Sequence, residues 1–112
     1  MRNTIKGKVI KGDGYGRKLG FPTVNLDVNT EEFPAEGVYA GQAILENKKY
    51  RAGIVIGPNN KIEAHLLGYD GDAYGKEVTL ELQKFIREYK KFKTEKELIE
   101  QIKNDIELVT RT

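Results

Sequence analysis

Apolar residues that alternate with polar ones constrain the fold of this 112-residue chain more than any other feature. In the segment from Lys76 to Ile86, Val78, Leu80 and Leu82 alternate with glutamate, threonine and glutamine. Successive side chains of a β-strand point to opposite faces, so this segment is predicted to be an antiparallel strand with one buried face. Similar strand patterns occupy residues 4–11, 37–45, 49–56 and 61–67.

Short turn sequences lie between the predicted strands, at residues 47–48, 57–60 and 70–72. They are rich in glycine, asparagine and aspartate, which favour tight turns, and they are consistent with successive antiparallel hairpins. Five or six short strands of this kind usually close into a barrel or form a sandwich. The chain is therefore predicted to be mainly β, and the pattern alone favours a barrel only slightly.

The last part of the chain changes to the period of a helix. Thr94 and Glu97 form a capping box, a pair that satisfies free backbone N–H groups at a helix start. The apolar residues that follow fall on one helical stripe: Leu98, Ile99, Ile102, Ile106 and Val109. We predict one amphipathic helix of roughly four turns, packed on the outside of the barrel or across one end.

Composition limits the classes of function. The chain has 19 basic and 17 acidic residues, a net charge of +2, so no global excess of charge indicates a nucleic-acid partner. Residues 2–18 and 84–93 are locally rich in lysine and arginine, which the simplest interpretation assigns to solvated strand faces. The chain has no cysteine and a single histidine, which excludes thiolate and multi-histidine metal sites. Any metal is therefore expected to be bound mainly by oxygen.

Length and hydropathy lead to further expectations. The length of 112 residues fits one domain, residues 1–112, and is too short for a second catalytic module. No apolar run approaches the roughly 20 residues that cross a bilayer, and the N-terminus lacks the hydrophobic region of a signal peptide. We therefore expect a cytoplasmic protein that interacts with no membrane. A monomer is also expected, but no pattern in the sequence decides the oligomeric state.

A glycine-rich segment indicates phosphate binding. Gly12, Gly14 and Gly16 allow the backbone to bring its N–H groups close to a phosphate, and Arg17 and Lys18 add positive charge. The spacing fits neither the Walker loop nor the dinucleotide fingerprint. A glycine-rich surface loop without a ligand remains an equal alternative from these glycines alone.

The residues after this loop indicate a cation site. Pro22 restricts Phe21 to extended backbone, so Thr23 and Asn25 are expected on a stiff segment with their side chains on the same face. A hydroxyl and an amide oxygen suit Mg²⁺, which usually takes its other ligands from water and substrate phosphates. The alternative is an ordinary strand.

A possible catalytic group lies in the segment 61–67. Glu63 and His65 are two residues apart and share one face of the predicted strand, while Ile62, Ala64 and Leu66 line the other. The Glu63 carboxylate is expected to reach a pocket inside or at the rim of the barrel. The alternative is a surface glutamate on an exposed strand, and His65 is expected to be structural.

Several blocks of the chain match the sequence patterns of a known family. Residues 12–25 follow the pattern Gly-x-Gly-x-Gly-Arg-x-Leu-Gly-Phe-Pro-Thr-Ala-Asn, with Val24 as the departure near its end. The family's Gly-Val-Tyr-Ala, Glu-x-His-Leu-Leu and Leu-Tyr-Gly-Lys blocks resemble residues 37–40, 63–67 and 73–76. The segment from Arg87 to Asp105 resembles its closing Arg-x-Glu-x-x-Phe and helix. The whole chain thus resembles riboflavin kinase, particularly the kinase module of the bacterial flavokinase/FAD synthetase.

This resemblance implies a six-stranded antiparallel Greek-key barrel with one C-terminal helix, and a complete site. Glu63 takes the position of the catalytic base, which accepts a proton from the ribityl 5′-hydroxyl of riboflavin as that oxygen attacks the γ-phosphate of ATP. The glycine-rich loop holds the triphosphate, and Thr23 and Asn25 hold Mg²⁺. Arg87 contacts the flavin or orders a flap. The expected ligands are riboflavin, FMN, ATP and ADP, with no nucleic acid.

The chain departs from the family between Gly57 and Glu63, where bacterial members usually carry several more residues. The family's Leu-Leu-Asp-Phe also becomes Leu-Gly-Tyr at residues 67–69, with the loss of an acidic residue. Two other readings therefore stay open: a non-catalytic flavin- or nucleotide-binding barrel, and a barrel that binds single-stranded nucleic acid. The nucleotide donor, ATP or another, also stays open.

Overall fold

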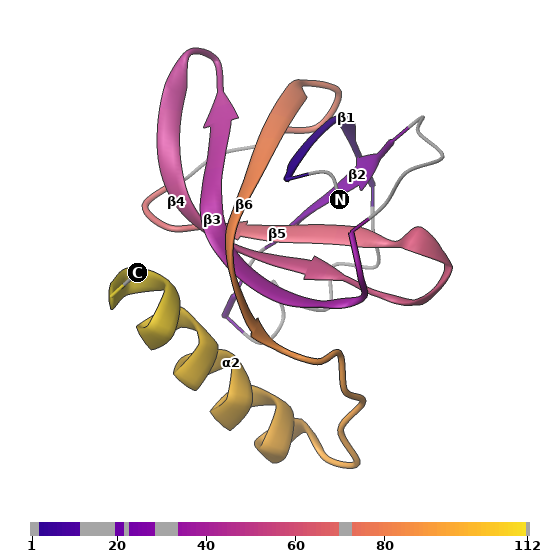
Figure 1. Ribbon diagram of the computed structural model, residues 1–112, viewed down its shortest axis with the longest axis vertical. Coiled ribbons are helices and arrows are strands. Elements are labelled where there is room, and N and C mark those ends of the chain that lie inside the picture. Colours follow the sequence, from indigo (N-terminus) through magenta and orange to yellow (C-terminus); the bar gives the residue numbers. More distant parts are fainter. Residues whose placement is uncertain (1–2, 12–19, 22, 29–33, 70–72, 112) are drawn as a thin grey trace.

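The computed structural model describes residues 3–11, 20–21, 23–28, 34–69 and 73–111. Its strands are β1 (Thr4–Ile10), β2 (Val24–Asp27), β3 (Gly37–Leu45), β4 (Lys48–Ile56), β5 (Ile62–Leu66) and β6 (Glu77–Arg87). A 3-10 turn at Pro58–Asn60 connects β4 and β5, and the helix α2 spans Glu95–Arg111. The strands close into an antiparallel barrel in the order β1-β2-β5-β4-β3-β6 (Figure 1).

The barrel contains a Greek key. Hairpins join β3, β4 and β5, and β6 then returns to pair with β3 on its other side. β6 also pairs with β1, which closes the barrel. The predicted six-stranded Greek-key barrel is therefore confirmed, but the expectation of successive hairpins is wrong at the turn of residues 70–72. β5 does not pair with β6, because turn residues mark where a strand ends and do not select its partner.

Alternation along the strands fills the interior of the barrel with aliphatic side chains. The largest fully buried ones are Leu45, Ile54, Ile56, Ile62, Val78 and Leu80. On β5, Ile62, Ala64 and Leu66 point inward, whereas Glu63 and His65 are partly exposed on the other face, as predicted. A small barrel filled in this way leaves its outer faces for ligands.

Two register shifts between β3 and β6 change which side chains of β6 face outward. The first places Phe85 opposite the buried Tyr39, and the second places Arg87 opposite Val38. β3 and β6 approach each other closely at Gly41, since a Cβ at this position would lie 1.9 Å from the carbonyl oxygen of Glu81. Such bulges bend a strand and redirect a side chain, and here they place Arg87 at the side where α2 packs.

The helix α2 lies outside the barrel, which is one of its two expected positions (Figure 1). The Thr94 hydroxyl accepts a hydrogen bond from the Glu97 N–H at 3.2 Å, so Thr94 caps the helix as predicted. Near the other end, Val109 is 1% exposed, and Arg51 of β4 donates to the Val109 carbonyl at 3.4 Å. Among the described residues, no helix has the length and apolar character needed to cross a membrane.

Candidate active site

A cavity of about 280 Å³ lies between the outer face of the barrel and α2. From the barrel it is lined by Val38, Gly53, Val55, Glu63 and His65. From the helix it is lined by Leu98, Ile102, Asp105, Ile106 and Val109. The expectation of a pocket inside or at the rim of the barrel is therefore wrong, because aliphatic side chains occupy the interior and the helix creates the cavity outside.

Glu63 belongs to the barrel wall of this cavity. It is paired with Asn25 of β2 on one side and with Val55 of β4 on the other. Its carboxylate is 3.5 Å from the Lys61 ammonium, and its side chain is 30% exposed. A carboxylate that is open to a cavity and to solvent can accept a proton from a bound substrate and release it to water.

The two predicted cation ligands lie beside Glu63. Thr23 lines the cavity, and Asn25 is directly across from Glu63 on the neighbouring strand. Residues opposite each other in an antiparallel pair point to the same face, so the Asn25 amide and the Glu63 carboxylate share the outer face. Thr23 and Glu63 thus line one cavity, and Asn25 is paired with Glu63. The role of Thr23 and Asn25 as cation ligands stays a prediction.

The predicted phosphate-binding residues Gly12, Gly14, Gly16, Arg17 and Lys18 lie outside the described residues. Their role stays a prediction.

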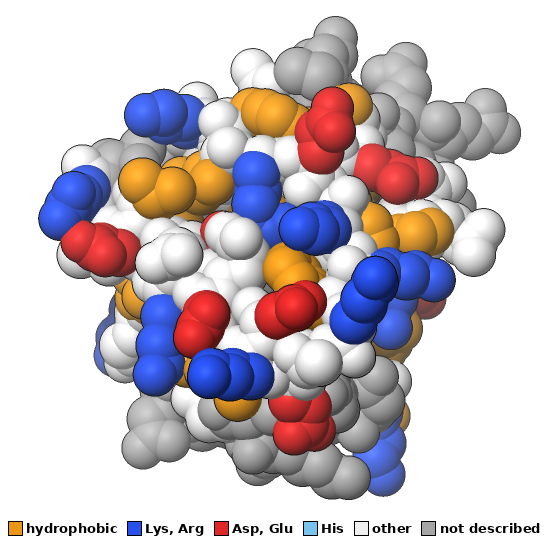
Figure 2. Space-filling view, turned by 90° about the horizontal axis from the view of Figure 1, so that it is seen from below, with side chains coloured by type: hydrophobic (Ala, Val, Ile, Leu, Met, Phe, Trp, Pro, Cys, Tyr) orange, Lys and Arg blue, Asp and Glu red, His pale blue; other side chains and the backbone are white. Residues whose placement is uncertain are grey.

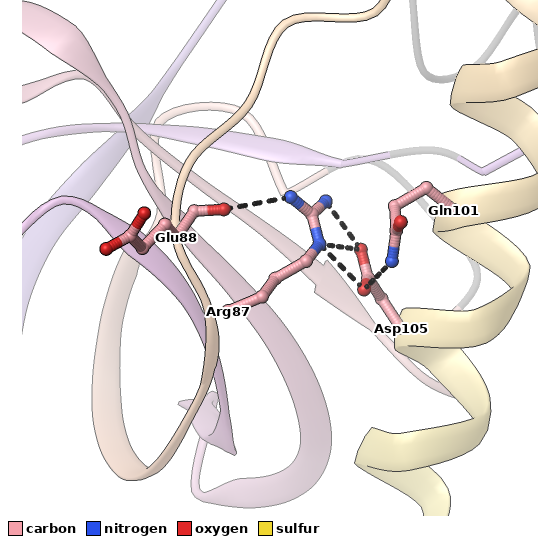
Figure 3. A network of polar contacts seen from close by, with 4 residues as sticks. All are labelled: Arg87, Glu88, Gln101 and Asp105. Atoms are coloured by element: carbon pink, nitrogen blue, oxygen red, sulfur yellow. Dashed lines mark hydrogen bonds and ion pairs between the residues drawn. The ribbon is translucent and has the colours of Figure 1, made fainter.

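Arg87 is engaged by the helix. Its Nε and Nη2 donate to Asp105 Oδ1 and Oδ2 at 3.0 and 2.8 Å, and Gln101 donates to the same carboxylate at 3.0 Å (Figure 3). A third group, Nη1, donates to the Glu88 carbonyl oxygen at 3.1 Å. The Arg87 and Asp105 side chains are 23% and 11% exposed. This two-bond ion pair therefore ties α2 and the segment after β6 to the barrel wall.

Sequence reasoning assigned no role in the site to Asp105. A signal was present, because Asp105 lies three residues after Ile102 and four before Val109, on the apolar stripe of α2. A carboxylate on the buried stripe of a helix needs a charged or hydrogen-bonding partner. That spacing could not identify Arg87 as the partner.

Aromatic side chains surround the remaining space. The Phe92 ring lies 5.7 Å from the Arg87 guanidinium carbon, and the rings of Phe21 and His65 meet edge to face with centroids 6.4 Å apart. The Tyr89 ring lies beside Gly57, where a Cβ would be in van der Waals contact with the ring at 3.4 Å. Aromatic and aliphatic walls with a few polar groups at one end suit a flat aromatic ligand.

The flavokinase model, described as riboflavin kinase, matches residues 2–112. The chain belongs to the riboflavin kinase family. A bifunctional riboflavin kinase/FMN adenylyltransferase of Escherichia coli (strain K12) is 36% identical over 115 residues, which cover 96% of this chain and 36% of that protein. The chain spans well under two thirds of the curated relatives it matches first, for example 17% of a trifunctional RibF/MnmA protein of Mycoplasmoides gallisepticum.

Solved structures share the fold of this riboflavin kinase family member. One titled a macrolide-efflux protein from Streptococcus pneumoniae aligns with a TM-score of 0.93 and 30% identity, over 97% of this chain and 38% of that chain. The riboflavin kinase from Trypanosoma brucei aligns with a TM-score of 0.75 and 22% identity, over 96% of this chain and 74% of that chain. The second likeness concerns the fold alone.

Proposed function

We propose that this chain transfers the γ-phosphate of ATP to the ribityl 5′-hydroxyl of riboflavin, giving FMN and ADP. The observation that carries the proposal is the position of Glu63, which opens into an aromatic-lined cavity beside Asn25 in a chain of the riboflavin kinase family. Isolated features of this kind occur in many proteins. Their combination on one face of the barrel supports this reaction.

In the proposed reaction, Glu63 accepts the proton of the 5′-hydroxyl. The new bond joins the 5′-oxygen to the γ-phosphorus, and the bond between that phosphorus and the β,γ-bridging oxygen breaks, with ADP as the leaving group. The solvent-exposed part of the Glu63 carboxylate then releases the proton to water. Phosphoryl transfer needs mainly positioning and neutralisation of charge, so the base can be an ordinary carboxylate.

The residues beside Glu63 fit Mg²⁺ as the cation that accompanies ATP. Thr23 and Asn25 offer neutral oxygen atoms, and the described residues contain no cluster of three or more His, Cys, Asp or Glu that forms a full protein cage. Two protein ligands suit an ion that takes its others from water and phosphates. When bound, Mg²⁺ would neutralise charge on the phosphates. We propose that Gly12, Gly14, Gly16, Arg17 and Lys18 bind the same phosphates.

The cavity under α2 is the proposed flavin site. Its apolar helix wall and the rings of Phe21, Tyr89 and Phe92 suit the flat isoalloxazine ring, with the ribityl chain directed towards Glu63. In this arrangement Arg87 acts as a positioning residue, because its guanidinium holds Asp105 and the Glu88 carbonyl oxygen. This favours the ordering of a flap over direct flavin contact as the role of Arg87.

We further propose that residues 1–112 act as one cytoplasmic, monomeric kinase domain with neither nucleic acid nor membrane as partner. The family match over residues 2–112 supports a single domain. On the face shown in Figure 2, basic and acidic side chains are interspersed among hydrophobic ones, in contrast to the single-sign surface that nucleic acid favours. Light scattering coupled to size-exclusion chromatography tests the monomer.

The function is tested by incubating the purified chain with riboflavin, Mg²⁺ and either ATP or CTP, and by separating the flavins chromatographically. We expect the parent to form FMN and Glu63→Gln to be slower by about 100-fold or more. The matched control is Glu77→Gln, which changes a glutamate on β6 that is 67% exposed and does not line the cavity, and it should act like the parent. Riboflavin binding without FMN formation from either nucleotide would instead support the non-catalytic barrel.

A further inference from the structure

Lys61 lies beside the proposed base, Glu63, and the proposed reaction assigns it no role. Lys61 directly precedes β5, and its Nζ lies 3.5 Å from Glu63 Oε1. The two residues are two positions apart on extended backbone, so both side chains project from the outer face of the barrel. The Lys61 side chain is 58% exposed, which leaves its ammonium group free to exchange one partner for another.

The backbone of Lys61 is held in place from two sides. Its carbonyl oxygen accepts a hydrogen bond from the Gly57 N–H at 2.8 Å, and its own N–H donates to the Pro58 carbonyl oxygen at 3.3 Å. These bonds close the short connection between β4 and β5, in which Asn59 and Asn60 adopt positive φ values of 60° and 58°. The shortened connection therefore fixes a lysine backbone next to Glu63.

The geometry of phosphoryl transfer places the γ-phosphate within reach of this lysine. A hydroxyl that gives its proton to Glu63 must lie about 3 Å from the carboxylate, and the phosphorus it attacks lies about 3–3.5 Å further on. The transferring group carries negative charge on three equatorial oxygens, which a nearby cation stabilises. An ammonium 3.5 Å from Glu63, on a flexible four-carbon stem, can reach one of these oxygens.

We propose that Lys61 is a further catalytic residue of this site, whose ammonium leaves Glu63 when ATP binds and donates a hydrogen bond to the transferring phosphoryl group. The inference rests on the proposed kinase function and assigns the phosphate contact to a residue outside the glycine-rich loop. The same movement releases the Glu63 carboxylate for the substrate hydroxyl. One lysine thus occupies the base in the free protein and neutralises phosphate charge in the complex.

A second ion pair on the barrel shows how a catalytic lysine can be distinguished from a lysine in an exposed surface ion pair. Lys6 and Glu77 lie 3.7 Å apart on β1 and β6, with 64% and 67% of their side chains exposed. Glu77 does not line the cavity, whereas Glu63, the partner of Lys61, does. Exposed pairs of this kind contribute little to stability. Lys6 is therefore a matched control, since it has a similar partner and exposure but no access to the reacting groups.

The test measures FMN formation by the parent, Lys61→Ala, Lys61→Arg and Lys6→Ala, with ATP and riboflavin varied separately. We expect Lys61→Ala to lose about 10- to 100-fold in kcat/KM for ATP, as expected for one lost donor to a charged transition state. Riboflavin affinity and the unfolding temperature should stay at the parent values. Lys61→Arg, which keeps the charge, should recover most of the loss, and Lys6→Ala should match the parent.

Three results would overturn the inference. If the parent forms FMN and Lys61→Ala matches its kcat/KM for ATP, Lys61 makes no contact with the phosphoryl group and only this inference fails. If Lys61→Ala loses activity together with unfolding temperature and riboflavin affinity, its role is structural. If the parent forms no FMN, the proposed function fails, and the role of Lys61 in that reaction fails with it.

Discussion

The two faces of β5 differ in burial and in chemistry. Its inward residues Ile62, Ala64 and Leu66 are at most 5% exposed, whereas Glu63 and His65 between them open into a cavity of about 280 Å³. The inward face has no room for a ligand, and the outward face has polar groups and space. One strand of five residues thus supplies both the core and the candidate chemistry.

The outward face of β6 shows what makes the difference. There Glu77 is exposed and paired with Lys6 in solvent, because no helix covers this side of β6 in the part of the chain that the structure describes. On β4 and β5 the outward side chains of Val55, Glu63 and His65 line a cavity whose other wall is α2, and the Arg87–Asp105 ion pair ties α2 to the barrel. Alternation alone therefore does not create a ligand site. The outward face of a strand becomes a candidate site only where the helix adds a second wall.

The largest expected effect on stability comes from the inward face. Ile62→Ala removes a side chain that is 1% exposed and leaves a cavity in the barrel core, so it should lower the free energy of unfolding by about 2–5 kcal/mol. Glu63→Gln, one residue away on the outward face, should change it by less than about 0.5 kcal/mol. Urea unfolding of both variants measures this contrast. Equal losses would contradict the assignment of the two faces.

The second effect concerns the tie between helix and barrel. Asp105→Ala leaves the partly buried Arg87 without its carboxylate partner, and should lower the free energy of unfolding by about 1–3 kcal/mol. Because the helix forms one wall of the cavity, riboflavin affinity should fall by about tenfold as well. Urea unfolding and fluorescence titration measure the two effects.

The control for this tie is Glu107→Ala, which removes an exposed glutamate that pairs with Arg111 on the same helix. Such a pair is worth about 0.5 kcal/mol or less, and riboflavin affinity should stay at the parent value. If Asp105→Ala binds riboflavin as tightly as Glu107→Ala does, the ion pair does not order the cavity wall.

The smallest effect concerns the start of α2. Thr94→Ala removes the hydroxyl that accepts the Glu97 N–H, and should lower the free energy of unfolding by about 1 kcal/mol. Thr110→Ala, near the end of the helix, removes only a bond to the Ile106 carbonyl and should have almost no effect. Thermal unfolding followed by circular dichroism compares the two, and a larger loss in Thr110→Ala would show that the cap does not hold the helix.

Local patterns in the sequence predicted most of the fold. The predicted strand at 37–45 coincides with β3, and those at 49–56 and 61–67 differ from β4 and β5 by one residue at one or both ends. The helix begins directly after its predicted cap at Thr94. These elements depend on alternation, turn residues and caps, which lie within a few residues of one another.

Features that depend on distant residues were not predictable in the same way. The register shifts opposite Val38 and Ala40 carry no sequence signal, yet they set the direction of Arg87. The partner of Asp105 is 18 residues away, on a different element. The cavity itself arises only when α2 packs against β4 and β3, so the sequence could place Glu63 on a face but not show what lies over it.

The most direct measurement is riboflavin binding to Val55→Trp, which fills the cavity from the outward face of β4. The control is Lys49→Trp, which adds the same ring at an exposed outward position on that strand. Ile102→Trp fills the cavity from the helix side, so the test still stands if Val55→Trp does not fold. If the flavin site lies on the covered outer face, both cavity variants lose riboflavin binding and FMN formation while Lys49→Trp retains them. Parent-like riboflavin affinity in folded Val55→Trp and Ile102→Trp would contradict this account.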